Sequence, residues 1–250
     1  MQSARRIAVV PAYNEEKTVS AVLDRLAPLV DELTVVDDGS TDGTRAAIKS
    51  CLGRHSNIRM LTFDVNQGMS EAYYAAFTDL RGRLEDGSLG PDDLVFTVDA
   101  DGQHEIDVFD ELETLTVGQA LDALLVQRDL STYPRYKQLG NSVLSIWATL
   151  WAGSRLRDVE SGYRVFRLGP LSHALDYYQG HRYSETVEVA VVMCRLGYSV
   201  RNDVLVPVPV YRSRTSLRDA VIDLAAIPAA AVRVGRKRAR PSREVTVTQA

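Results

Sequence analysis

Three short apolar runs, separated by segments with helical periodicity, constrain the fold of this chain more than any other feature. The runs are Ile7–Val10, Leu33–Val36 and Leu94–Val98, and Pro11 is expected to end the first. Between the first two runs, apolar residues recur at the spacing of a helix, and a second helix is predicted over Thr44–Leu52. Alternation of this kind predicts an α/β fold with an open, mostly parallel sheet flanked by helices, whose ligand binds where the strands end.

The third run leads into the sequence DADGQH, which places two carboxylates two residues apart. In an extended backbone Asp99 and Asp101 project to the same face, and Gln103 follows in the same phase. Carboxylate and amide oxygens suit a hard divalent cation, Mg²⁺ or Mn²⁺, that keeps open positions for phosphate oxygens. The alternative is an ordinary polar turn, in which Asp and Gly are the usual residues.

The second run leads into DDGSTDGT, with Asp37 and Asp38 at its end. Asp38, like Glu15 after the first run, can accept hydrogen bonds from a base or from ribose hydroxyls. Asp42 and Gly43 are assigned to the turn itself.

Together the segments PAYNEE (11–16), DDGSTDGT (37–44) and DADGQH (99–104) resemble glycosyltransferase family 2, which has the GT-A fold. The resemblance covers about the first 110 residues. It implies a metal site at Asp99, Asp101 and Gln103, with Asp101 also catalytic, on the diphosphate of a GDP- or UDP-linked sugar. It also implies the following nucleotide contacts: Pro11, Tyr13, Glu15, Asp37, Asp38 and Asp99. The chain departs from the family pattern at Met69 and Ser70, where a basic residue and a glycine are usual.

The second half, with DVESGYRVF at 158–166, resembles the polyprenyl-phosphate sugar transferases, a subgroup that includes dolichyl-phosphate mannose and glucose synthases. Guanidinium groups match phosphate oxygens in a bidentate way, although arginine is also common on any protein surface. The resemblance implies catalytic roles for Arg128 and Arg164. It implies an acceptor-phosphate site at Arg135, Ser161, Arg212 and Ser216.

No residue stands out as a general base. An acceptor monophosphate is already anionic near neutral pH, so the transfer needs positioning and charge neutralisation more than it needs a base. The family resemblance implies inversion at the anomeric carbon, and a QxxRW motif typical of processive polysaccharide synthases is absent from the sequence.

The composition, with 250 residues of which 45% are hydrophobic, favours a single domain, and the resemblance implies that residues 1–216 form one GT-A domain. A net charge of −4 gives no support to nucleic-acid binding. The cysteines Cys51 and Cys194 are expected to be free thiols in a reducing compartment. No signal peptide and no apolar run long enough to span a bilayer are found, so a cytoplasmic location is expected.

The C-terminal part differs in character from the rest. Residues 217–240 are apolar and then basic, which suits a helix on an anionic membrane surface, a solvated basic tail being the alternative. Residues 241–250 are expected to be disordered. The leading hypothesis is therefore a metal-dependent, inverting glycosyltransferase that acts on a polyprenyl phosphate at the inner membrane face. The alternatives are a family 2 enzyme with a soluble small-molecule or glycan acceptor, and a nucleotide-sugar-binding protein without turnover.

Overall fold

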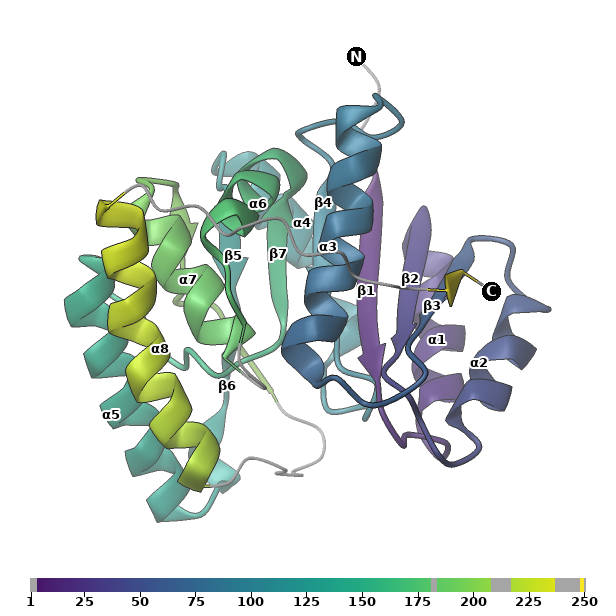
Figure 1. Cartoon of the computed structure of the whole chain (residues 1–250), viewed down its shortest axis with the longest axis horizontal. Coiled ribbons are helices and arrows are strands. Elements are labelled where there is room, and N and C mark those ends of the chain that lie inside the picture. The colour runs from purple at the N-terminus through teal and green to yellow at the C-terminus, as the bar shows by residue number, and fades with distance from the viewer. Residues whose placement is uncertain (1–3, 181–183, 208–216, 237–247, 250) are drawn as a thin grey trace.

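Four parallel strands form the centre of the sheet in the computed structural model, which describes residues 4–180, 184–207, 217–236 and 248–249 (Figure 1). They are β1 (Arg6–Ala12), β2 (Glu32–Asp37), β3 (Ile58–Thr62) and β4 (Leu94–Thr97). The full strand order is β10-β3-β2-β1-β4-β7-β5-β8. The further strands are β5 (Ala123–Leu125), β7 (Arg164–Arg167), β8 (Val200–Arg201) and β10 (Thr248–Gln249). Because β7 runs antiparallel to both β4 and β5, the sheet is mixed and mostly parallel, as predicted.

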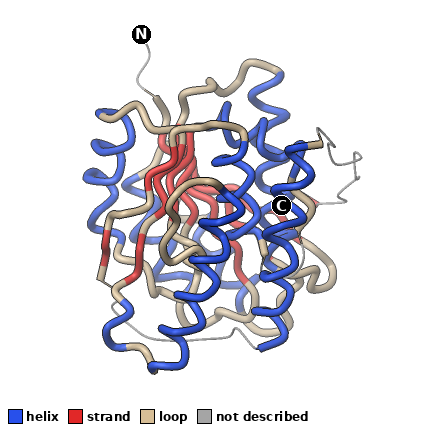
Figure 2. The backbone as a smooth tube through the Cα atoms, turned by 90° about the vertical axis from the view of Figure 1, so that its left-hand side faces the viewer, coloured by secondary structure: helices blue, strands red, loops and turns tan. Residues whose placement is uncertain are grey.

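Helices cover both faces of this sheet (Figure 2). One face carries α1 (Val19–Leu26), α2 (Thr44–Leu52) and α4 (Phe109–Gly118). The other carries α3 (Met69–Glu85), α5 (Arg135–Ala152), α6 (Leu168–Ala174), α7 (Glu185–Arg195) and α8 (Leu217–Gly235). Short 3₁₀ turns lie at Ala27–Leu29, Ile106–Val108, Leu130–Thr132 and Leu175–Tyr177. A small parallel pair, β6 (Gln127–Arg128) with β9 (Leu205–Val206), follows β5.

Strand β1 shows why the apolar runs are continuous rather than alternating. Ile7 and Val9 pack into the core on one face of the sheet, while Ala8 and Val10 pack into the core on the other. A strand that is buried on both faces needs apolar residues at every position.

The expectation that Pro11 ends β1 is wrong, because the strand continues to Ala12. Val9 accepts a hydrogen bond from Val98 on the β4 side, and alternate residues of a strand bond to the same neighbour. The nitrogen of Pro11 therefore faces the side on which β4 has already ended, where no N–H is needed.

Two other boundaries differ from the sequence-based expectations. Strand β4 ends at Thr97, so Asp99 and Asp101 lie in the following turn rather than on an extended strand. Thr248 and Gln249, in the segment expected to be disordered, pair with the outer edge of β3 as strand β10. An unpaired strand edge is a ready template for such pairing.

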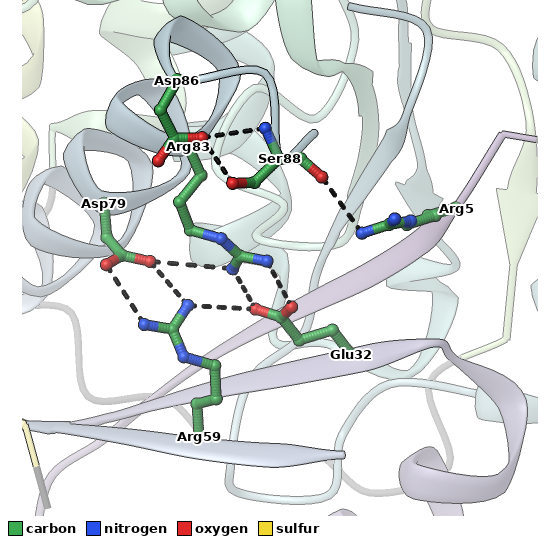
Figure 3. Close-up of polar contacts among 7 residues, drawn as sticks. All are labelled: Arg5, Glu32, Arg59, Asp79, Arg83, Asp86 and Ser88. Atoms are coloured by element: carbon green, nitrogen blue, oxygen red, sulfur yellow. Dashed lines mark hydrogen bonds and ion pairs between the residues drawn. The ribbon is translucent and has the colours of Figure 1, made fainter. Parts of the chain in front are cut away.

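The amino-terminal edge of the sheet is closed by ion pairs (Figure 3). Glu32, the first residue of β2, binds Arg83 of α3 and Arg59 of β3, and Arg59 also binds Asp79. Burial alone would raise the pKa of Glu32, but the hydrogen bonds from Arg83 and Arg59 outweigh it and lower that pKa. These side chains satisfy one another, so this edge is structural and the loops at the opposite edge are left to hold a ligand.

Helix α8 is part of the packed fold. It lies against α5 and α7, and its Arg233 binds Glu188 of α7 and the Tyr177 carbonyl. None of the helices in the described ranges is both long and apolar enough to cross a membrane. Cys51 and Cys194 are both free thiols.

Candidate active site

The loops after β1 and β2 interlock at the carboxyl edge of the sheet. The Asn14 N–H donates to Ser40 Oγ at 3.1 Å, and the Glu15 N–H donates to Thr44 Oγ1 at 2.7 Å. Pro11 and Glu15 are buried, whereas Tyr13 is 38% exposed. Of the three residues predicted here as nucleotide contacts, Tyr13 therefore offers the most accessible surface.

Asp37, the last residue of β2, is fully buried and bonded by the protein itself. Its Oδ1 accepts the Ser40 N–H at 3.0 Å, and its Oδ2 binds the Arg45 guanidinium. Arg45 also donates to the Phe63 carbonyl at 2.8 Å. Asp37 therefore holds the turn after β2 and, through Arg45, the end of β3.

Asp38 binds the next loop in the same manner. Its carboxylate accepts hydrogen bonds from the Gln67 N–H at 2.7 Å, the Gly68 N–H at 2.9 Å and the Asn66 side-chain amide at 2.8 Å. Burial raises the pKa of Asp38, although the two N–H donors oppose that rise. Gly39 permits this approach, since a Cβ there would lie 2.5 Å from the Asn66 nitrogen. Asp38 therefore fixes the loop that begins α3.

Asp99 has a different environment. Its N–H donates to His104 Nδ1 at 3.2 Å, which assigns the ring proton to Nε2, 3.3 Å from Asp99 Oδ2. The other oxygen, Oδ1, is buried and has no hydrogen-bond partner. Burial would raise the pKa of Asp99, but the nearby His104, Arg128 and Arg164 together lower it. The site thus holds an ionised carboxylate with a free acceptor oxygen.

Gly162 forms the floor beneath this carboxylate. A Cβ at position 162 would lie 3.0 Å from Asp99 Oδ1 and 3.1 Å from Oδ2. The segment is tied to β4, because Thr97 Oγ1 donates to the Gly162 carbonyl at 2.5 Å. A side chain at this position would require the Asp99 carboxylate to shift by a few tenths of an ångström.

Asp101 and Gln103 lie together in the turn after Asp99. The Gln103 N–H donates to Asp101 Oδ1 at 3.0 Å, and the Gln103 side-chain amide donates to Asp101 Oδ2. Among the described residues, no three His, Cys, Asp or Glu side chains gather closely enough to hold a metal alone. Asp99 and Asp101, with the partnerless Asp99 Oδ1, fit a divalent cation whose remaining ligands come from a substrate.

Arg128 lies on β6, and its side chain pairs with Asp158. Its Nε donates to Asp158 Oδ2 at 2.9 Å and its Nη2 donates to Oδ1 at 2.6 Å, while the ring of Tyr133 lies 5.8 Å from the guanidinium carbon. Burial disfavours the charge, yet Asp158 outweighs burial and raises the pKa of Arg128. Asp158 has a positive φ of 44°, a conformation that the surrounding contacts must maintain. The pairing fixes the Arg128 guanidinium in one orientation.

Arg164, the first residue of β7, lies inside the protein rather than at its surface. It donates to the carbonyls of Ser161 at 2.8 Å, Val159 at 2.7 Å and Thr186. Burial lowers its pKa to about 10. Arg164 therefore supports the 159–162 segment from behind.

Two of the four predicted acceptor-phosphate residues, Ser161 and Arg135, are among the described residues. Ser161 is buried, and its hydroxyl has no hydrogen-bond partner. Arg135 is exposed at the start of α5. Arg212 and Ser216 lie outside the described residues.

A small cavity behind Gly162 was not predicted from the sequence. It has a volume of about 20 Å³, and Thr97, Gly162, Arg164 and Glu185 are among its lining residues. Burial raises the pKa of Glu185 to about 8, and Ser70 Oγ donates to its Oε2 at 2.9 Å. Glu185 thus links the start of α3 to the region beneath Asp99. Its place in the sequence, as an acidic residue in the first turn of α7, gives no sign of this role.

Comparison with known proteins gives consistent matches. The sequence model of Glycosyl transferase family 2 matches residues 7–147. Undecaprenyl-phosphate mannosyltransferase of Micrococcus luteus is 27% identical over 201 residues, covering 77% of this chain and 79% of that protein. UDP-N-acetylglucosamine–dolichyl-phosphate N-acetylglucosaminyltransferase of Methanococcus voltae is 26% identical over 202 residues, covering 74% and 78%.

Among solved structures, glucosyl-3-phosphoglycerate synthase from Mycobacterium tuberculosis shares the fold. It superposes with a TM-score of 0.69 at 18% identity, covering 92% of this chain and 80% of that one. That structure was determined in complex with Mn²⁺, UDP-glucose and phosphoglyceric acid.

Proposed function

Because the chain belongs to glycosyl transferase family 2, we propose that it moves a sugar from a nucleoside diphosphate sugar to the phosphate of a polyprenyl carrier. That it is a glycosyltransferase follows from the family. The acceptor is inferred from relatives matched over about three quarters of the chain, which are named for transfer to undecaprenyl or dolichyl phosphate.

The observation that carries this proposal is the buried, partnerless Oδ1 of Asp99. An ionised carboxylate oxygen without a donor is costly unless a ligand satisfies it. Asp99 and Asp101 would hold Mg²⁺ or Mn²⁺, with Gln103 orienting Asp101. The bound metal would neutralise charge on the leaving nucleoside diphosphate.

On the donor side, the chain supplies a preformed set of loops. We assign nucleoside contacts to Tyr13 and Glu15, on the loop after β1, and to Pro11 beneath them. Asp37 and Asp38 act through the loops they hold, since their oxygens already accept protein donors. Their effect on nucleotide affinity is therefore indirect.

On the acceptor side, we assign the phosphate to Arg128 and Arg135. Asp158 accepts from Nε and from one N–H of Nη2 of Arg128, which leaves Nη1 and the second N–H of Nη2 to donate to an acceptor oxygen. A pre-oriented guanidinium loses little freedom on binding a phosphate. No general base is required, because the phosphate is already an anionic nucleophile.

The test is an assay of nucleoside diphosphate release with a panel of UDP- and GDP-linked sugars and a short-chain polyprenyl phosphate. We expect release with Mg²⁺ or Mn²⁺, loss of release in excess EDTA, and a product of inverted anomeric configuration by NMR. Release without a glycosylated lipid phosphate would contradict the proposal.

A second candidate acceptor is a small soluble phosphate ester. The specific observation is the shared fold with glucosyl-3-phosphoglycerate synthase, solved with phosphoglyceric acid. Adding 3-phosphoglycerate to the same panel distinguishes the two, because only the true acceptor raises release above the hydrolytic background.

A further inference from the structure

Helix α5 exposes a stripe of large apolar side chains. The stripe consists of Tyr136, Leu139, Val143, Ile146 and Leu150, each between 51% and 70% exposed. Their spacing alternates between three and four residues, so they lie along one side of the helix. We call this set the α5 stripe.

The α5 stripe is not the face that joins the core. Leu144, Ala148 and Ala152 of the same helix are buried and pack against the other helices on this side of the sheet. The helix is therefore apolar on two sides, and packing within the described part of the chain accounts for only one of them.

Helix α8 widens this surface. It lies beside α5 at the left of Figure 1, and Trp147 Nε1 donates to the Leu224 carbonyl at 3.0 Å. The exposed side chains of α8 between residues 221 and 232 are all apolar, Val221 and Leu224 among them. The only charged residue in that span of the sequence is Asp223, which is buried.

The charges around this surface favour a lipid partner over a second copy of the chain. When two helices pack through apolar residues spaced three and four apart, charged residues commonly flank the apolar stripe. No charged residue occurs between Gln138 and Gly153. Instead, cationic residues lie at both ends of α5: the exposed Arg135 begins the helix, and the exposed Arg155 and Arg157 follow it.

We propose that the α5 stripe, with the exposed apolar side chains of α8, lies on the surface of an anionic lipid bilayer. The apolar side chains enter the acyl boundary and the arginines at both ends of α5 meet lipid phosphates. The purpose of this contact rests on the proposed function. Since α5 begins seven residues after Arg128, the contact brings the assigned acceptor site to the membrane that carries a polyprenyl phosphate.

Vesicle flotation tests this directly. The full-length protein is mixed with vesicles of phosphatidylcholine alone or with added phosphatidylglycerol. We expect flotation with the anionic vesicles, and a loss of about tenfold or more in partitioning for the double variant Ile146→Gln, Leu150→Gln. A second double variant, Leu139→Gln with Val143→Gln, should behave alike. The control is Val117→Gln, an exposed apolar residue on α4, which should partition as the unchanged protein does.

Three results would overturn the inference. They are equal partitioning of both double variants and the unchanged protein, no flotation of the unchanged protein, or light scattering that shows a dimer which the double variants disrupt. The last would assign the α5 stripe to a second copy. Transfer to a water-soluble, short-chain polyprenyl phosphate is measured in parallel and should not change in the variants. If transfer fails with every acceptor while flotation depends on the stripe, the proposed acceptor is wrong and the membrane surface stands.

Discussion

Two carboxylate pairs lie at the carboxyl edge of the sheet, and their surroundings differ. Asp37 and Asp38, after β2, accept hydrogen bonds from backbone and side-chain donors of their own and neighbouring loops. Asp99, after β4, binds His104 through one oxygen and leaves the other, buried, without a partner.

The difference distinguishes carboxylates that fix the loops of the site from a carboxylate that is open to a ligand. Asp37 and Asp38, whose oxygens accept donors from several loops, contribute by fixing those loops, whereas the buried empty oxygen of Asp99 is left for a ligand. Asp101 accepts hydrogen bonds from Gln103, two residues away, so these bonds tie it to no other loop. Similar sequence motifs, two acidic residues followed by Gly, therefore serve different ends in the same sheet. Changes to Asp99, Gly162 and Asp38 each alter one side of this comparison.

The largest effect is expected for Asp99→Asn. The amide keeps the shape of the carboxylate but removes the charge that would hold a metal, so turnover should fall about 10³-fold or more. The assay is nucleoside diphosphate release with the preferred donor. Asp92→Asn, an exposed carboxylate that pairs with Arg167, is the matched control and should retain full activity. A variant as active as this control would remove Asp99 from the site.

Gly162→Ala should have the next effect. The new Cβ would lie 3.0 Å from Asp99 Oδ1, forcing that carboxylate to shift. A displaced Asp99 carboxylate keeps its charge but stabilises the transition state less well. We therefore expect kcat to fall by about 10- to 100-fold. Gly82→Ala, where nothing lies within 4 Å of the added carbon, serves as control. Unchanged kcat at position 162 would show that the floor is not rigid.

Asp38→Asn tests the role of the pair Asp37 and Asp38 in fixing the loops. An amide accepts through only one oxygen, so it cannot satisfy the three donors on Asn66, Gln67 and Gly68. The free energy of unfolding should drop by about 1.5–3 kcal/mol, measured from urea midpoints. Nucleotide affinity should weaken with or without metal. A fully stable variant with a purely metal-dependent defect would instead place Asp38 on the ligand.

Near pH 5, Glu185→Gln should give the smallest effect, and that effect should grow with pH. The folded protein keeps the Glu185 proton until its pKa of about 8, whereas the unfolded chain releases it near 4.5. Between these values, the contribution of this group to the free energy of unfolding falls by about 1.4 kcal/mol per pH unit as pH rises.

The Gln variant mimics the protonated form and lacks this slope. In urea unfolding between pH 5 and 8, the free energy of unfolding of the variant should therefore rise relative to that of the parent as pH rises. Glu85→Gln, at the exposed end of α3, should keep the parental slope. Parallel curves for parent and Glu185→Gln would show that Glu185 is ionised in the fold.

Local pattern was enough to predict the family and the central sheet except for strand β3, which was not predicted. Continuous apolar runs identified β1, β2 and β4, and helix α2 was predicted with its observed bounds, because these features depend on neighbours in sequence. The antiparallel direction of β7 and the extension of β1 through Pro11 both depend on which strand lies alongside. The periodicity of a single segment does not encode its neighbouring strand.

The supporting contacts of the site depend on distant pairings. Arg128 meets Asp158 thirty residues away, and Ser70 meets Glu185 across 115. Sequence reasoning treated Arg128 and Arg164 alike, but the fold buries Arg164 among backbone carbonyls and pairs Arg128 with a carboxylate. A single sequence gives the residue types for such contacts, not the partners.

The most direct test of the central claim, that Asp99 is completed by a metal and a diphosphate, is calorimetry of UDP and GDP binding with and without Mn²⁺. The unchanged protein should bind its preferred nucleotide at least about tenfold more tightly with Mn²⁺. Asp99→Asn should lose that enhancement, while Asp38→Asn should retain it at a lower overall affinity. An undiminished Mn²⁺ enhancement in Asp99→Asn would contradict the account.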